Sequence, residues 1–272
     1  MDLGKAIKET VDYIRKNTKS APEIGIILGT GLGALVKEIN TEIQIDYDKI
    51  PNFPVSTVES HAGRLIFGKI SGKNVVAMQG RFHFYEGYDL NQVTFPVRVM
   101  KELGVKILIV SNAAGGMNPL YSVGELVLIT DHINFQGQNP LIGKNDDSLG
   151  PRFPDMHNCY DKDLRSLAEQ TALEEKVPLQ KGVYVGVTGP NLETAAEYRF
   201  LRIIGGDLVG MSTVPEVLVA RHQGTKVLGF SLVTDMGLAD AHEPCSHEKI
   251  IAAANKAEPK LTKLVKKIIE KI

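Results

Sequence analysis

The stretch that decides the fold reads Gly80-Arg81-Phe82-His83-Phe84-Tyr85-Glu86-Gly87. It directly follows the apolar run at residues 75–78, which is typical of a buried strand, so its polar groups come where a strand of an α/β sheet ends. If the chain stays extended, Arg81, His83 and Tyr85 project from one face, because side chains alternate along a strand. Phe82, Phe84 and Glu86 then point the other way. The first face suits a phosphate-like oxyanion beside a hydroxylated ring, whereas an exposed polar edge strand is the alternative.

A second glycine-rich stretch follows the apolar run at residues 24–28 and reads Gly29-Thr30-Gly31-Leu32-Gly33. An apolar-periodic helix is expected after it, so backbone N–H groups and a helix N-terminus would be available to an anion. Thr30 adds a hydroxyl donor. The spacing is GxGxG and not GxGxxG, and no lysine follows as in a P-loop, which makes a dinucleotide-binding protein a distant alternative. A simple tight turn remains open for this stretch.

Further strands are expected at residues 105–110, 126–130, 182–187 and 227–233, and most end in polar or small residues. Residues 111–116 follow the first, 188–194 the third, and Thr234 with Asp235 the last. Because open α/β sheets bind ligands at the carboxyl ends of their strands, these segments predict one crevice. Residues 136–158 are expected to form a long ordered loop. We predict an α/β protein with a mixed, mostly parallel sheet flanked by helices, and one domain over residues 1–272.

Composition limits the possible partners and the compartment. The 272 residues carry 31 Lys+Arg against 32 Asp+Glu, so the net charge of -1 indicates no nucleic acid or anionic membrane as partner. Cys159 and Cys245 are isolated, which fits buried thiols in a reducing cytoplasm. Residues 3–14 predict an amphipathic helix and not a signal peptide, and no apolar run approaches the ~20 residues needed to span a bilayer. We therefore expect a cytoplasmic protein.

Five blocks together resemble the trimeric purine nucleoside phosphorylases, in register from about Ile24 to the final helix. They are Gly29-Thr30-Gly31-Leu32-Gly33, Gly80-Arg81-Phe82-His83-Phe84-Tyr85-Glu86-Gly87, Ser111-Asn112-Ala113-Ala114-Gly115-Gly116, Gly189-Pro190-Asn191-Leu192-Glu193-Thr194 and Gly210-Met211-Ser212-Thr213-Val214-Pro215-Glu216. The resemblance implies the nucleoside phosphorylase fold and the reversible phosphorolysis of purine nucleosides to a free base and (deoxy)ribose 1-phosphate in purine salvage. It implies no metal and no cofactor, with inorganic phosphate as co-substrate.

The resemblance also assigns roles to residues. The phosphate-binding group is Thr30, His61, Arg81, His83, the backbone N–H of Ala113, and Ser212. The nucleoside-binding group is Tyr85, Met211 and His247 at the ribose, and Leu192, Glu193, Val209 and Asp235 at the purine. Asp235, His83 and Glu193 are the implied catalytic residues. Phe153 would reach over the sugar bound by a neighbouring subunit of a homotrimer.

Asp235 departs from the family pattern, because enzymes for 6-oxopurines usually have asparagine there. An amide can donate to a 6-oxo group while accepting from N7–H, whereas an ionised carboxylate only accepts. Asp235 therefore raises the alternative of a 6-aminopurine preference, for adenosine or methylthioadenosine, although Glu193 suits the N1–H of a 6-oxopurine. Thr30 replaces the commoner serine, and Leu192 replaces an aromatic residue. An alternative from another class is a non-catalytic nucleoside-binding protein on the same fold.

Overall fold

The computed structural model describes residues 2–29, 33–55, 62–240 and 246–272, without the side chain at position 247. Nine strands within these ranges join one sheet in the order β2-β3-β4-β1-β5-β8-β7-β6-β9. The strands are β1 (Ile24–Leu28), β2 (Asn40–Asp46), β3 (Arg64–Ile70), β4 (Lys73–Gln79), β5 (Ile107–Gly116), β6 (Leu126–Asn134), β7 (Gln180–Gly186), β8 (Leu208–Gly210) and β9 (Lys226–Met236).

The sheet closes on itself at one end, because β5 pairs with β9 as well as with β8. The pairs β1–β4, β1–β5, β5–β9, β6–β7 and β7–β8 are parallel. The pairs β2–β3, β3–β4, β5–β8 and β6–β9 are antiparallel. The sequence-based expectation of a mixed sheet is therefore confirmed. The closed part brings the ends of β5, β8 and β9 together, where the sequence predicts the crevice.

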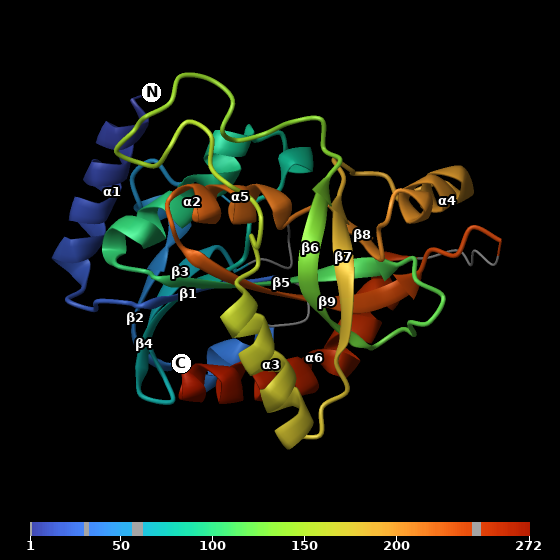
Figure 1. Ribbon diagram of the computed structural model, residues 1–272. Coiled ribbons are helices and arrows are strands. Elements are labelled where there is room, and N and C mark those ends of the chain that lie inside the picture. The colour runs from blue at the N-terminus through green and yellow to red at the C-terminus, as the bar shows by residue number, and fades with distance from the viewer. Residues whose placement is uncertain (1, 30–32, 56–61, 241–245) are drawn as a thin grey trace.

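Helices cover both faces of the sheet (Figure 1). They are α1 (Leu3–Asn17), α2 (Leu90–Leu103), α3 (Lys162–Glu174), α4 (Ala195–Ile203), α5 (Val214–His222) and α6 (His247–Lys271), with 3-10 turns η1 (Gly33–Glu38), η2 (Tyr47–Lys49) and η3 (Phe84–Glu86). One apolar cluster joins α1, α2 and α5 to the sheet, and a second joins α3 and α6 to its opposite face. A small third cluster places α4 against β7 and β8. The sheet is thus the middle of three layers.

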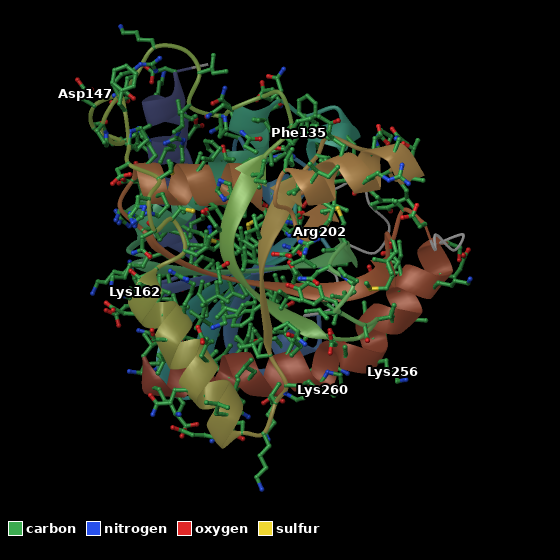
Figure 2. All side chains as sticks on the ribbon, turned by 45° about the vertical axis from the view of Figure 1, so that its right-hand side comes forward. Phe135, Asp147, Lys162, Arg202, Lys256 and Lys260 are labelled. Atoms are coloured by element: carbon green, nitrogen blue, oxygen red, sulfur yellow. The ribbon has the colours of Figure 1, made fainter. Side chains whose placement is uncertain are left out.

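Alternation along the strands produces the two clusters. Ile27 of β1 packs in the cluster of α2, whereas its neighbours Ile26 and Leu28 pack in the cluster of α6, and all three are buried. Both faces of the strand are covered, which is why its sequence is apolar throughout. The amphipathic stripe expected on the last helix is present, and Figure 2 shows Lys256 and Lys260 on its outer side.

The structure corrects two local expectations. The segment after Gly33 is a 3-10 helix and not an α-helix. Strands β5 and β9 continue through the small and polar residues expected to follow them, because the two strands pair with each other from Ile107 opposite Lys226 to Gly116 opposite Met236. Asp235 thus lies in a strand. Cys159 is buried as expected, whereas Cys245 lies outside the described residues. Within the described ranges, no helix is both long and apolar enough to cross a membrane.

Candidate active site

A crevice of about 350 Å³ lies where β4, β5, β8 and β9 end. It collects ten residues that the sequence analysis assigned to a site, namely Arg81, His83, Tyr85, Ala113, Leu192, Glu193, Val209, Met211, Ser212 and Asp235. Asn112, Ala114, Gly115, Pro190, Gly210, Thr234 and Ile250 complete the lining. Segments far apart in the sequence therefore meet at one place, as the strand ends predict.

The other four assigned residues are not among the described residues that line this crevice. Thr30 and His61 lie outside the described residues. His247 is the first residue of α6, and its side chain is likewise outside the description. Phe153 lies on the long loop with 87% of its surface exposed, and the Arg152 guanidinium stacks 5.6 Å from its ring centre. The exposed ring is available to another molecule.

The segment after β4 does not stay extended, which corrects the expectation for residues 81–86. After His83 the chain turns into η3, and Glu86 folds back instead of pointing away. Its Oε1 accepts a hydrogen bond from the backbone N–H of His83 at 2.8 Å and lies 2.9 Å from His83 Nδ1. An ionised carboxylate only accepts, so Nδ1 carries the proton. The Tyr85 ring stacks on the imidazole, with centres 4.6 Å apart and planes at 15°.

Arg81 is buried, with 2% of its surface exposed, and is fixed by partners on two other elements. Its Nε and Nη2 donate to Glu216 Oε1 at 3.1 and 2.8 Å, and its Nη1 donates to the carbonyl of Ser111 at 2.8 Å. Glu216 belongs to α5 and is equally buried. The guanidinium is held in one orientation, and the carboxylate offsets part of its charge. Sequence reasoning gave Glu216 no role, and its only signal was an acidic residue in the first turn of a helix.

A strained turn places Ser212 before α5. Thr213 has φ 71° and ψ -52°, and the N–H of Val214 donates to the carbonyl of Ser212 at 2.7 Å, which is the geometry of a γ-turn. A β-branched residue rarely adopts this conformation, so the surroundings must maintain it. Thr213 Oγ1 accepts from Asn112 Nδ2 at 2.9 Å and lies 3.1 Å from Ser212 Oγ. Ser231 in turn donates to Asn112 Oδ1 at 2.7 Å.

This buried network ties Ser212 to the middle of the sheet, through β5 and β9. It also leaves the Ser212 hydroxyl beside the N-terminus of α5, where backbone N–H groups and the helix dipole favour an anion. Sequence reasoning missed both Asn112 and Thr213 as supporting residues, because their hydrogen bond joins positions 101 apart in the chain. Asn112 belongs to the strand-end segment at residues 111–116 that predicts the crevice, and Thr213 belongs to a block that carries only the family resemblance.

Two carboxyl groups, Glu193 and Asp235, line the same crevice. Burial raises the pKa of Glu193, the negative charge of Asp235 raises it further, and a hydrogen bond from Tyr198 opposes the shift. The Thr234 hydroxyl lies 2.9 Å from Asp235 Oδ1 and 3.3 Å from the carbonyl of Ala114. The crevice therefore combines a cationic, donor-rich group at Arg81 and Ser212 with an acidic pair.

Apolar side chains provide flat walls between these polar groups. Val209 is buried, Met211 is half-buried, and 44% of Leu192 is exposed. Such walls suit a planar ring, and the acidic pair supplies acceptors for its N–H groups. Within the described part of the chain, no group of three or more His, Cys, Asp or Glu residues could hold a metal ion.

Comparisons with known proteins identify the family and the fold of the chain. The model of the phosphorylase superfamily matches residues 23–270. "Purine nucleoside phosphorylase 1" of Bacillus subtilis is 54% identical, with 97% of each chain covered. A schistosoma purine nucleoside phosphorylase in complex with hypoxanthine superposes with a TM-score of 0.94 at 46% identity, covering 98% of this chain and 97% of that one. Isoform 2 from Schistosoma mansoni, in complex with cytosine and ribose-1-phosphate, gives 0.95 at 44% identity, covering 98% and 96%.

Proposed function

The chain belongs to the phosphorylase superfamily, and we propose that it is a purine nucleoside phosphorylase, a pentosyltransferase of purine salvage. The reaction uses inorganic phosphate to split the bond between a purine and its (deoxy)ribose, and releases the base and a sugar 1-phosphate. The observation that carries this proposal is the crevice itself, which places Arg81 and Ser212 in one cavity with Glu193 and Asp235. Relatives named for this activity, such as the 54% identical protein of Bacillus subtilis, support it.

In this proposal phosphate occupies the cationic part of the crevice. Arg81, Ser212, His83 and the backbone N–H of Ala113 bind it, together with Thr30 and His61, which lie outside the described residues. The phosphate dianion then attacks the anomeric carbon as the sugar becomes cationic. The Glu216 and Ser111 contacts fix Arg81 before the anion arrives. Such preorganisation lowers the barrier, because the donors need not reorient during the reaction.

The sugar lies between the phosphate and the base. Tyr85, which stacks on His83, contacts one side of the ribose. Met211, which follows β8, contacts another side. His247 binds the 5′-hydroxyl. The stacking supports this assignment, because it fixes the phenol beside the imidazole that faces phosphate. Because Glu86 holds the proton on His83 Nδ1, the other ring nitrogen, Nε2, is the one that can accept a hydrogen bond from phosphate or sugar.

The base leaves toward the acidic pair, with Leu192 and Val209 along its faces. Negative charge develops on the departing purine, and a hydrogen bond at N7 that stabilises this charge contributes about 3 kcal/mol. Asp235 takes the N7 position and Glu193 binds the N1 edge. Burial, and to a smaller degree the charge of Asp235, raises the pKa of Glu193, so Glu193 retains a proton more easily, and that proton neutralises the charge on the base.

The second candidate function is a phosphorylase that prefers 6-aminopurines, and Asp235 in place of an amide favours it. A substrate panel decides between the candidates: inosine, guanosine, adenosine and methylthioadenosine, each with and without phosphate, followed by release of the base. Release that requires phosphate supports the proposed activity. Binding of nucleosides without any phosphate-dependent release would instead indicate a non-catalytic nucleoside-binding protein, and would refute the proposal.

The proposal extends to the assembly and the cofactor. The exposed Phe153 supports a homotrimer in which this ring covers the sugar of a neighbouring site. Sedimentation equilibrium should then give three chains, and Phe153→Ala should raise the KM for nucleoside while the trimer persists. Phosphate is the co-substrate, and neither metal nor organic cofactor takes part, so dialysis against a chelator should leave turnover unchanged. We place the enzyme in the cytoplasm, with residues 1–272 acting as one domain.

A further inference from the structure

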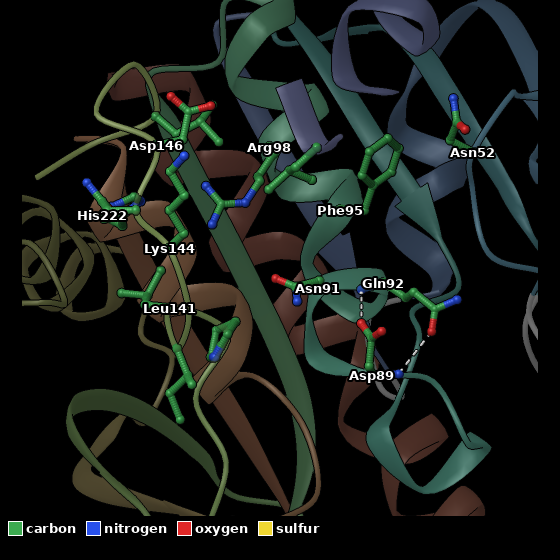
Figure 3. Close-up of a pocket in the computed structure, with 15 residues that line it drawn as sticks. Asn52, Asp89, Asn91, Gln92, Phe95, Arg98, Leu141, Lys144, Asp146 and His222 are labelled. Carbon is green, nitrogen blue, oxygen red and sulfur yellow. Dashed lines mark hydrogen bonds between the residues drawn. The ribbon is translucent and has the colours of Figure 1, made fainter. Parts of the chain in front are cut away.

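A second cavity, of about 450 Å³, is larger than the crevice and shares no lining residue with it. It lies between α2, the end of α5 and the loop at residues 140–149 (Figure 3). Nothing in the proposed phosphorolysis uses it. Its apolar lining comes mainly from Phe95, Leu141 and Leu149, and its polar lining includes Arg98, Lys144 and His222.

Arg98 is the feature that defines this cavity. Only 4% of its surface is exposed, yet its Nε and Nη1 atoms have no hydrogen-bond partner among the described residues. Burial lowers the pKa of Arg98 and the charge of Asp146 opposes that shift. In Figure 3 the guanidinium points from α2 across the cavity, toward Lys144, Asp146 and His222. Leaving two nitrogens of a buried guanidinium unpaired is costly, because the desolvation of their N–H groups is not compensated.

The groups around Arg98 complete a cationic, donor-rich site. Lys144 lies on the exposed loop and lines the cavity. His222 is 5% exposed, and burial followed by the charge of Arg98 lowers its pKa, so it is neutral at pH 7 and offers one N–H. The carbonyls of Gly150 and Pro151 oppose that shift, but neither ring nitrogen has a partner with hydrogen-bonding geometry in the described structure.

Both acidic groups of the cavity accept hydrogen bonds from nearby residues; those from Ser148 lower the pKa of Asp146, and the charges of Arg98 and Lys144 lower it further. Asp146 Oδ1 accepts from the N–H and the hydroxyl of Ser148, at 3.0 and 2.6 Å. Asp89 and Gln92 cap the N-terminus of α2 reciprocally, as the dashed lines in Figure 3 mark, at 2.8 and 3.0 Å. Among the described residues, the unpaired groups of the cavity are therefore Nε and Nη1 of Arg98 and the ring nitrogens of His222, and not the end of α2.

We propose that this cavity binds a phosphate-type oxyanion, held by Arg98 with Lys144 and His222. A planar guanidinium recognises such an anion through paired N–H groups. The anion comes either as free phosphate or as the phosphate group of an ester, whose organic part would pack on Phe95 and Leu141. The volume exceeds that of the crevice proposed for a nucleoside and phosphate together, which favours the ester.

The test counts anion sites by isothermal titration calorimetry with two probes, inorganic phosphate and adenosine 5′-monophosphate. The variants are Arg98→Met, which keeps volume and removes the charge, and Lys144→Gln on the exposed loop. Lys101→Met is the matched control, because Lys101 lies on the same helix and does not line the cavity. Circular dichroism and turnover of the substrates show whether each variant is folded.

We expect one of the two probes to bind the cavity. Its affinity should fall at least about tenfold in Arg98→Met and about threefold in Lys144→Gln, and should stay unchanged in Lys101→Met. Turnover stays at the parent level in all three. If Arg98→Met weakens binding of adenosine 5′-monophosphate alone, the ligand is a phosphate ester. If it weakens binding of inorganic phosphate alone, the ligand is the free anion. If neither probe distinguishes the parent from Arg98→Met, the proposal is refuted. Should Arg98→Met fail to fold, an unchanged affinity in Lys144→Gln refutes it instead.

Discussion

The Arg81–Glu216 pair gives the sharpest test of the site, through the substitution Glu216→Gln. Both side chains are nearly fully buried, with 2% and 3% of their side-chain surface exposed, and Oε1 of Glu216 accepts two of the hydrogen bonds of Arg81. Glutamine keeps an acceptor at that place but removes the charge. It also puts an amide NH₂ where Glu216 Oε2 is buried without a partner in the described structure.

The magnitude follows from these contacts. The two hydrogen bonds from Arg81 lose their charged acceptor, at about 1 kcal/mol each, and a buried unsatisfied amide costs about 1–3 kcal/mol. Leaving the buried charge of Arg81 without its counter-ion falls in the range of about 3–5 kcal/mol measured for broken buried pairs. We therefore expect Glu216→Gln to lower the free energy of unfolding by about 3–5 kcal/mol. Phosphate should restore part of this loss, because the anion then becomes the main partner of Arg81.

The assay is urea unfolding followed by circular dichroism, at one fixed protein concentration, with and without phosphate. Asp240→Asn is the matched control, because Arg199 and Asp240 form a pair of 2.7 Å whose side chains are 55% and 89% exposed. The control should leave the midpoint almost unchanged, since exposed pairs contribute little. If Glu216→Gln shifts the midpoint no further than Asp240→Asn does, the buried pair does not hold the site together. Equal stabilisation of parent and variant by phosphate would refute the charge argument.

Three further predictions concern the acidic pair and the strained turn. Asp235→Asn should raise the ratio of kcat/KM for inosine over adenosine at least about tenfold, or about 1.4 kcal/mol, because the amide can donate to O6; an unchanged ratio contradicts our assignment of Asp235. Raising the pH above about 4.5 should destabilise the parent relative to Glu193→Gln. The raised pKa means that the folded protein keeps the Glu193 proton to a higher pH than the unfolded chain does, and the stability this contributes is lost as the pH passes the raised pKa. Parallel profiles of thermal stability against pH would exclude the shift. Thr213→Val should cost about 1–3 kcal/mol, because it leaves Asn112 Nδ2 buried without its acceptor, and should raise the KM for phosphate, whereas Thr213→Ser should do neither.

The sequence predicted the parts of this molecule that depend on local pattern. The apolar runs at β1 and β4 are buried strands, and the residues after β4 reach the crevice. Strand β8 was not predicted, because three residues, Leu208–Gly210, are too few to show a period. The turn at Glu86 was also missed, because it depends on a side chain that binds its own backbone three residues earlier.

The parts that sequence could not predict depend on contacts between distant positions. Arg81 and Glu216 lie 135 positions apart in the sequence, and no pattern around either residue predicts that the two side chains pair. The same holds for Arg98, which lies in a helix whose other buried residues are mostly apolar. Its Nε and Nη1, unpaired among the described residues, become buried only after α2 and α5 have packed together. Pairs of residues that are far apart in the sequence form only when the chain folds. A sequence motif can therefore identify the residues of a site, but not the distant residues that hold them in place.

In the proposed function, the support of Arg81 explains how the phosphate site could bind the anion and still leave it reactive. An arginine with no counter-ion in a buried crevice would bind the dianion in the ground state as strongly as in the transition state, and uniform binding of that kind does not raise kcat. Glu216 offsets part of the charge before phosphate arrives, while the Ser111 carbonyl keeps the guanidinium plane fixed. The remaining attraction comes from oriented donors at Ser212 and the start of α5, which act over short distances. As the sugar becomes cationic next to the bound phosphate, its positive charge adds to the attraction for the dianion that Glu216 has reduced. The stabilisation of the bound phosphate is therefore largest at the transition state.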